Sequence, residues 1–286
     1  MFDPMTNKFP YPERTDGHYI KVGMDRGYVF DGEYPYVDKS RGFRFKRFWV
    51  RVLLRLVVFP MISIRLGLKI QGKNNLKKYK DLLASGAVSC SNHVHMCDYI
   101  AVMNAVKPVK PYVLVWDKNV NGESGPLVRL VGGVPIPNNS LAGANAYLKA
   151  VGDILDGGWL HVYGEGSMWE YYAPIRPFKK GAAYFACKHG KPIVPMAFSY
   201  RKPSALRKKL FGQAACFTLS IGEPITADET LKFNERVDDL TRRVHAEVCR
   251  LAGIDPTENV YGAVFRDDAR VDYYTSEYGV GYKKSY

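Results

Sequence analysis

The chain has 286 residues, of which 47% are hydrophobic, so it can bury a sizeable core, most simply in one α/β domain with flanking segments. Its five cysteines form no Cys-x-x-Cys pair and are odd in number, which argues against a disulfide framework and predicts reduced thiols in a cytosolic setting. The polar, proline-interrupted N-terminal sequence is not typical of a secretory signal.

The first 80 residues divide into two unlike parts. Residues 1–40 are rich in Tyr, Pro, Gly and Asp and are predicted to form an irregular arm. Residues 41–80 contain twelve Lys or Arg and no Asp or Glu, whereas the remainder of the chain has 29 basic and 28 acidic side chains. Almost all of the net charge of +13 therefore lies in one segment, which predicts contact with an anionic surface.

Residues 41–67 predict a basic amphipathic helix. Arg47, Arg51 and Arg55 recur every fourth residue among aromatic and aliphatic side chains that include Trp49. The longest uncharged run is nine residues, whereas a bilayer-spanning helix needs roughly 20. We therefore expect the helix to lie on a membrane surface, with the arginines at the headgroups. The alternative is a core helix whose arginines reach solvent; nucleic acid is not expected, because apolar residues dominate the segment.

From residue 68 to 254, short apolar runs alternate with helical stretches. Strands are predicted at residues 68–72, 87–92, 111–116, 132–137, 159–167, 192–200 and 214–222. Helices are predicted at residues 73–85, 99–106, 141–158, 178–190 and 228–252. This alternation predicts an α/β fold with a mostly parallel central sheet flanked by helices. Residues 255–286 contain six tyrosines and form a C-terminal tail without a predicted structure.

Two histidines, a cysteine and an aspartate follow one of these strands in the stretch SNHVHMCD, residues 91–98. Functional residues of parallel sheets collect where strands end and helices begin, and WLHVY followed by GEGS is a second such junction. One interpretation is a metal site built from His93, His95 and Asp98. The sequence has four other histidines, and none lies in a metal-ligand motif, so we expect no metal.

The other interpretation is a proton relay. His93 ends the strand, and Asp98 falls in the first turn of the next helix, where its carboxylate can fold back onto the imidazole. This contact would fix the tautomer of His93 and raise the basicity of its free nitrogen toward a hydroxyl. A nucleophilic Cys97 has no known signature spacing, and Ser167 lacks the G-x-S-x-G elbow.

These motifs resemble the glycerophospholipid acyltransferase family. NHVHMCD is an Asn-His-x4-Asp box, and three further blocks follow in the family's order: GGVPIPNN, YGEGSMW and KPIVPMAF. RPFKKGAAYFA is similar to the helix after the third block. The likeness covers roughly residues 45–225, and its weight lies in the ordered set, because His-x4-Asp alone is a weak signal.

The resemblance implies transfer of an acyl chain from acyl-CoA or acyl-carrier protein to a lysophospholipid hydroxyl, with no metal, cofactor or covalent enzyme intermediate. By this likeness His93 deprotonates the hydroxyl and Asp98 orients His93, while Glu165, Gly166 and Ser167 hold the glycerol part of the acceptor. It also implies a peripheral or monotopic enzyme of phospholipid biosynthesis on the cytoplasmic face of an anionic membrane.

The chain departs from the family pattern at Asn138 and Met168, where the second and third blocks usually carry arginine. Those arginines are implied to bind the acceptor phosphate, so Arg176, Lys179 and Lys180 become the candidates to replace them. We expect 1-acyl-glycerol-3-phosphate as acceptor, giving phosphatidic acid, with another lysolipid or a glycolipid as the first alternative. A metal-dependent hydrolase using the His-x-His cluster and an inactive lipid-binding module are the competing classes.

Overall fold

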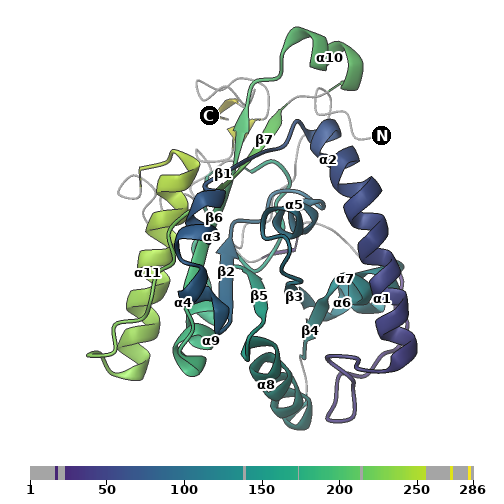
Figure 1. The fold of residues 1–286 in the computed structure, drawn as a ribbon, viewed down its shortest axis with the longest axis vertical. Helices are drawn as coiled ribbons and strands as arrows, with labels where there is room; N and C mark the ends of the chain where they lie inside the picture. The colour runs from purple at the N-terminus through teal and green to yellow at the C-terminus, as the bar shows by residue number, and fades with distance from the viewer. Residues whose placement is uncertain are drawn as a thin grey trace.

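The structure is a computed structural model that describes residues 17–18, 23–137, 140–172, 174–212, 215–255, 271–272 and 283–284. Within these residues, a central sheet has seven strands in the order β1-β7-β6-β2-β5-β3-β4 (Figure 1). The strands are β1 (Lys69–Gln71), β2 (Ala87–Ser91), β3 (Tyr112–Trp116), β4 (Gly133–Ile136), β5 (Trp159–Tyr163), β6 (Ile193–Arg201) and β7 (Cys216–Ile221).

Most neighbouring strands of this sheet run parallel. Only β6 and β7 pair antiparallel, in a register that runs from Met196↔Ile221 to Arg201↔Cys216; the pairs β1–β7, β2–β6, β2–β5, β3–β5 and β3–β4 are parallel. Parallel neighbours need a crossover connection, which the intervening helices supply. The predicted α/β fold with a mostly parallel, helix-flanked sheet is confirmed.

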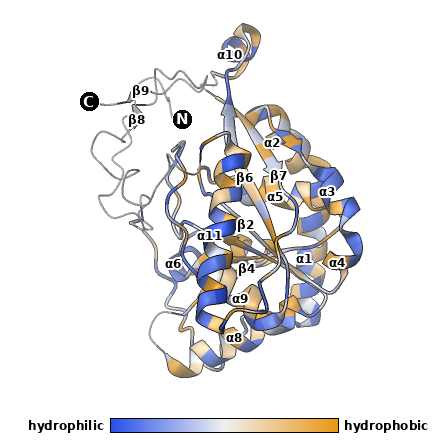
Figure 2. Cartoon of the chain, turned by 90° about the vertical axis from the view of Figure 1, so that its left-hand side faces the viewer, coloured by the Kyte–Doolittle hydropathy of each residue, from blue (hydrophilic) through white to orange (hydrophobic). Residues whose placement is uncertain are grey.

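Three helices cover one face of the sheet: α8 (Leu141–Leu155), α9 (Gly181–His189) and α11 (Phe233–Ala252). Helix α11 buries Val237, Leu240, Thr241, Val244, His245, Val248 and Cys249. This spacing of three or four residues places one apolar stripe on the sheet. In Figure 2 the strands are mostly white to orange, whereas blue residues lie along the outer sides of α8 and α11.

The other face is covered by α5 (Asp98–Ala105) and by a long N-terminal helix. The long helix consists of α1 (Arg41–Leu53), a π-helical segment η1 (Leu54–Val58) and α2 (Phe59–Leu66). The Ser40 hydroxyl accepts from Phe43 N and caps its start. Its buried side chains, Leu54, Phe59, Ile62 and Leu66, join the core around α5.

The π-helical segment has a local cause in Pro60. Proline lacks an N–H, and its ring conflicts with the carbonyl four residues earlier, so a regular α-helix is disfavoured there. The wider turns of η1 accommodate this residue without a break in the helix. They also rotate the faces of α1 and α2 relative to a regular helix, so a fixed period cannot predict which side chains face outward.

The arginines of α1 and η1 do not lie on one outward face, which corrects the predicted arrangement. The Arg47 guanidinium lies 4.1 Å from the centre of the Tyr112 ring on β3, and Arg51 is half-buried beside it. Arg55 is exposed, and Trp49 is exposed on the outer side of α1. No helix of the described part of the chain is long and apolar enough to cross a bilayer.

Several elements differ from the prediction or were absent from it. The predicted helix at 73–85 is divided into α3 (Lys73–Lys78) and α4 (Lys80–Ala84), and α6 (Asp117–Asn121), α7 (Gly125–Val131) and α10 (Ala205–Phe211) were not predicted. The C-terminal tail lies largely outside the described residues, apart from a short antiparallel pair, β8 (Val271–Asp272) and β9 (Lys283–Lys284). In the N-terminal arm, Arg26 N donates to Asn121 O at 2.9 Å and so joins the arm to α6.

Candidate active site

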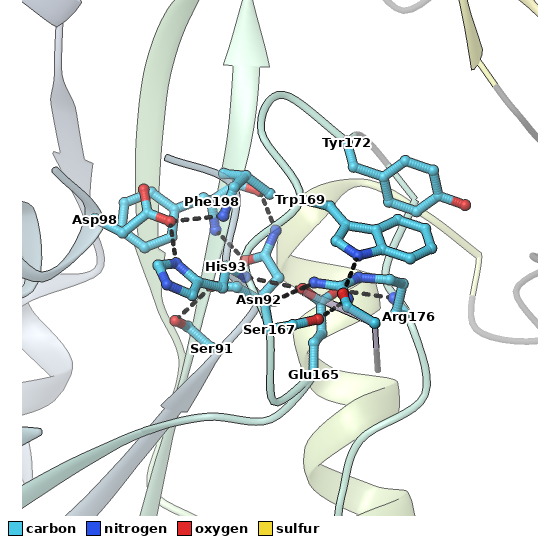
Figure 3. A network of polar contacts seen from close by, with 12 residues as sticks. Ser91, Asn92, His93, Asp98, Glu165, Ser167, Trp169, Tyr172, Arg176 and Phe198 are labelled. Atoms are coloured by element: carbon cyan, nitrogen blue, oxygen red, sulfur yellow. Dashed lines mark hydrogen bonds and ion pairs between the residues drawn. The ribbon is translucent and has the colours of Figure 1, made fainter. Parts of the chain in front are cut away.

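The ends of β2 and β5 bring the two predicted polar clusters together. In this parallel pair Ser91 lies opposite Tyr163, so the loops after both strands begin at the same edge of the sheet. Backbone hydrogen bonds join the loops: Gly164 N donates to Ser91 O at 2.9 Å, and Trp169 N donates to His93 O at 3.0 Å. Figure 3 shows the polar network that results.

His93 and Asp98 are in direct contact. His93 Nδ1 lies 3.1 Å from Asp98 Oδ2, and the same oxygen accepts from Val94 N at 2.7 Å and His95 N at 2.9 Å. Because Oδ2 already faces two backbone donors, we assign the imidazole proton to Nδ1, which leaves Nε2 as an acceptor. Asp98 is 2% exposed and His93 is 21% exposed, so the pair is reached through the imidazole.

Burial determines the protonation of this pair. It lowers the pKa of His93 to about 3, so the ring is neutral at pH 7 and Nε2 is unprotonated, whereas the contact with Asp98 favours the imidazolium. Burial also raises the pKa of Asp98 to about 7, whereas His95 and the two backbone hydrogen bonds lower it. Three donors converge on Oδ2, and this geometry favours the carboxylate form of Asp98.

Two residues without a predicted role hold His93 in place. The Tyr163 ring stacks on the imidazole with centroids 3.6 Å apart and planes 8° from parallel. Asn92 pairs with Phe198 of β6 as a strand residue would: its Oδ1 accepts from Phe198 N at 2.8 Å, and its Nδ2 donates to Phe198 O at 3.0 Å. The signal for Asn92 was its place directly before the histidine of the box; Tyr163 had no comparable signal.

A buried ion pair organises the glycine loop after β5. Glu165 Oε2 accepts from His93 N and from Arg176 Nη2, both at 2.9 Å, and its Oε1 accepts from Arg176 N at 2.8 Å. Arg176 Nη1 donates to Ser167 Oγ at 2.7 Å, Nη2 also donates to Ser167 O, and the guanidinium lies 4.3 Å from the Trp169 ring centre. These contacts tie the loop directly to the backbone of His93.

Arg176 is not placed where contact with an acceptor phosphate would require it. Its side chain is 0% exposed and is occupied by Glu165 and Ser167, so the structure corrects that prediction. Lys179 is exposed beside the loop, and a Cβ added at Gly166 would lie 2.8 Å from the Lys179 side chain. Of the predicted replacements, Lys179 and Lys180 are exposed, and Lys180 forms an ion pair with Asp238; Asn138 lies outside the described residues.

His95 points away from the pair. Its Nδ1 accepts from Cys97 N at 3.0 Å, and its ring contacts Tyr171 and Phe217 edge-on. Burial raises the pKa of Cys97 to about 11, so the thiol is protonated at neutral pH. In the described part of the chain, no three His, Cys, Asp or Glu side chains are gathered as metal ligands.

A second histidine, His161, is fully buried beneath the pair. Its Nδ1 lies 2.9 Å from Ser89 Oγ, and its Nε2 lies 3.3 Å from Ser91 Oγ. Trp159 Nε1 donates to the same Ser89 hydroxyl at 2.8 Å. Burial lowers the pKa of His161 to about 3, so this residue is a neutral part of the core at pH 7.

Comparisons with known proteins identify the domain that holds this site. Residues 67–199 match the family model described as Acyltransferase. No curated protein matches the chain. Among solved structures, the chain is similar to the 1-acyl-sn-glycerophosphate (LPA) acyltransferase PlsC from Thermotoga maritima, with 16% identity, 74% of this chain and 84% of that chain covered, and a TM-score of 0.45. The matched residues include the His93–Asp98 pair and the Glu165 loop, so residues 67–199 form an acyltransferase domain and the protein is an acyltransferase enzyme.

Proposed function

We propose that the enzyme moves an acyl chain from a thioester, acyl-CoA or acyl-carrier protein, to the free hydroxyl of a lysophospholipid. The favoured acceptor is 1-acyl-glycerol-3-phosphate, which would give phosphatidic acid. The observation that carries the proposal is the His93–Asp98 pair, which sits in an acyltransferase domain with an imidazole reachable from outside.

The proposed reaction uses His93 as general base. Nε2 takes the proton of the acceptor hydroxyl while that oxygen attacks the thioester carbonyl. The carbon–sulfur bond then breaks, and the thiol leaves with the proton that His93 returns. Asp98 stabilises the transient imidazolium through Nδ1, so no covalent enzyme intermediate or bound metal is required.

The acceptor would lie against the loop after β5. The side chains of Glu165 and Ser167 are engaged within the protein, so their proposed contribution is to fix the loop rather than to contact the ligand through those groups. Gly166 and Lys179 form its exposed part. We assign the acceptor phosphate to Lys179, because its ammonium is the exposed cation beside Gly166.

The acyl substrates imply a membrane surface, and the long N-terminal helix offers one side to it. Its exposed apolar residues follow one another at steps of one, three or four positions, as Phe45, Phe48, Trp49, Leu53, Leu56, Val57, Met61 and Ile64. We call this set the outer stripe. An apolar stripe beside exposed cations, Arg55 among them, is typical of helices that lie in the membrane interface. We propose peripheral attachment through the outer stripe at the cytoplasmic face.

A turnover screen tests this function directly. Purified enzyme is incubated with acyl-CoA or acyl-carrier protein and a panel of lysolipids on anionic vesicles, and products are identified by mass spectrometry. We expect phosphatidic acid from 1-acyl-glycerol-3-phosphate, and a loss of about 10²–10⁴-fold in His93→Ala. A product that forms equally well in His93→Ala would overturn the mechanism, and sensitivity to a chelator with rescue by zinc would favour a metal-dependent reaction.

A further inference from the structure

Two arginines on the inner side of α1 have buried donor groups without protein partners. Arg47 Nη1 donates to the Tyr112 hydroxyl, and the guanidinium stacks on that ring. Its Nε and Nη2, together with Nε and Nη2 of Arg51, are buried and have no hydrogen-bond partner among the described residues. Four N–H-bearing atoms from adjacent turns of one helix thus lie close together and unused.

The charge of these arginines is also unmatched. No ion pair involving Arg47 or Arg51 is present in the described part of the chain, and residues 41–80 contain no acidic residue. At the same helix interface, Arg129 of α7 has a carboxylate partner, with Nη2 3.6 Å from Asp38 Oδ2. Burial, and then the positive charge of Arg47, lower the pKa of Arg51 to about 10, which still leaves it protonated at pH 7.

A glycine keeps space beside the two side chains. Gly132, in the turn before β4, has φ of +114°, and a Cβ added there would lie 2.8 Å from Pro111 O, 3.2 Å from Arg47 Nη2 and 3.3 Å from the Tyr99 hydroxyl. Any larger residue would press on the Pro111 carbonyl and then on the guanidinium, in a backbone conformation that side chains rarely adopt. The inner side of α1, Tyr99, Tyr112 and Gly132 therefore enclose the unused donors.

We infer that Arg47 and Arg51 form a binding site for a phosphate group between α1 and the β3–β4 edge of the sheet. Guanidinium groups bind phosphate oxygens through paired N–H donors, and a phosphate dianion would balance both charges at once. Without an anion, two like charges one helical turn apart remain partly desolvated, which is an unfavourable arrangement.

This site is separate from the candidate active site. Tyr112 begins β3 and lies opposite Leu160, near the start of β5, whereas His93 follows the far end of β2. The inference therefore stands without the proposed function. The phosphate could belong to a phospholipid headgroup, to the nucleotide part of a CoA thioester, or to free inorganic phosphate, and the three sources can be distinguished by competition.

Thermal unfolding of the whole chain in potassium phosphate and in potassium chloride of equal ionic strength provides the test. We expect phosphate to raise the Tm of the wild type. Arg47→Met and Arg51→Met should each weaken the apparent phosphate affinity by about tenfold or more. Arg44→Met, at an exposed position of the same helix, is the matched control and should leave the phosphate response intact. Arg51→Lys, which keeps the charge but loses the planar fork, should fall between these results.

Competition then identifies the source of the phosphate. CoA, phosphatidic acid vesicles and phosphatidylcholine vesicles are each added to the phosphate titration, and a competitor that removes the phosphate response names the ligand class. If none competes, free phosphate is the ligand. Equal Tm values in phosphate and chloride for the wild type, or an unchanged phosphate response in Arg47→Met/Arg51→Met, would overturn the inference. If the Met variants do not fold, Arg51→Lys decides between charge alone and a fitted site.

Discussion

Two regions of this enzyme contain arginines with buried nitrogen atoms, and the surroundings of those atoms are opposite. In the loop after β5, Arg176 is 0% exposed and bonds to Glu165 and Ser167 through side-chain and backbone groups. Beneath α1, Arg47 and Arg51 have four buried nitrogen atoms without a hydrogen-bond partner in the described residues. In the first region Glu165 balances the charge of Arg176. In the second, Arg47 and Arg51 have no acidic partner among the described residues, so their charge can be balanced by an anion from outside the chain.

The difference indicates two uses of a buried charge. A matched pair holds a loop in a fixed geometry, since breaking it would leave one charge desolvated and alone. Glu165 extends that order to the reacting residue by accepting the N–H of His93. Two arginines without an acidic partner differ from such a pair, because they reach their lowest free energy only when they bind an anion. We therefore interpret the loop after β5 as a structure that positions His93, and the inner side of α1 as the inferred phosphate site.

The largest expected effect concerns Asp98, which orients His93. Asp98→Asn keeps an oxygen for the backbone donors of Val94 and His95 but removes the charge that stabilises an imidazolium. We expect transfer to fall by about 10²–10⁴-fold with the fold intact. Steady-state rates and near-ultraviolet circular dichroism measure the two quantities. An active Asp98→Asn enzyme would show that Asp98 serves only the backbone of the loop.

The stability of two arginine variants compares the regions directly. Arg176→Met leaves Glu165 buried without its cation, and we expect a loss of about 3–5 kcal/mol in the free energy of unfolding. Arg51→Met in phosphate-free buffer removes a charge that has no partner, so we expect a change within about 1 kcal/mol or a gain.

Chemical denaturation of both variants measures this contrast. Glu165→Gln/Arg176→Met should recover part of the loss, because it removes both charges of the pair. Equal destabilisation by Arg176→Met and Arg51→Met would contradict the distinction between matched and unmatched charge.

A substitution of Lys179 tests whether the exposed part of the loop after β5 binds the acceptor. Lys179→Ala should raise the KM for 1-acyl-glycerol-3-phosphate by roughly ten- to a hundredfold, since a charge-assisted contact to phosphate contributes about 1.5–3 kcal/mol. The KM for the thioester should change less. The control is Lys188→Ala on α9, an exposed lysine that bonds to Tyr184. If phosphate preference over a larger headgroup is the same in wild type and Lys179→Ala, the assignment fails.

The outer stripe of the N-terminal helix should contribute to membrane attachment through apolar area. Leu56 is 70% exposed and Ile64 is 58% exposed, so Leu56→Gln and Ile64→Gln should not disturb the core. Each should weaken partitioning onto anionic vesicles by about 1 kcal/mol, or roughly fivefold. Leu141→Gln is a matched control, because Leu141 is 89% exposed on α8 on the other face of the sheet. Unchanged co-sedimentation of both stripe variants would remove this surface from the proposal.

Sequence reasoning was most successful where the chain repeats a regular period. The alternation of strands and helices predicted all seven strands of the sheet among the described residues, and the strand-to-helix junctions brought His93 near the loop of Glu165. Both results follow from rules that depend only on local spacing and on parallel topology. The short helices α6, α7 and α10 were missed because none spans more than two turns.

The failures share a different cause. The predicted arginine face assumed one helical period, whereas η1 inserts wider turns that separate Arg55 from Arg47 and Arg51. The Glu165–Arg176 pair spans 11 residues of irregular loop, where no period indicates which side chains meet. Contacts that depend on a local irregularity, or on a path through a loop, are not encoded by spacing.

The pH dependence of stability also separates the two regions. In the folded chain burial lowers the pKa values of His93 and His161 to about 3, whereas in the unfolded chain both would protonate near pH 6.5. Below pH 6.5 the unfolded state therefore binds more protons, so stability falls as pH decreases.

A single variant isolates one of these contributions. Each histidine contributes a slope of about 1.4 kcal/mol per pH unit between its unfolded and folded pKa values. His161→Gln removes one titrating group that lies outside the proposed mechanism, so its free energy of unfolding should decrease less steeply from pH 6.5 to 5, by about that slope. Denaturant titrations at several pH values measure it, and parallel curves for wild type and His161→Gln would show that His161 is protonated in the folded protein.

The α1 region should not share this dependence, because Arg51, with a pKa of about 10, stays charged throughout this range. Loss of phosphate binding in step with the histidine titration would therefore count against two independent regions.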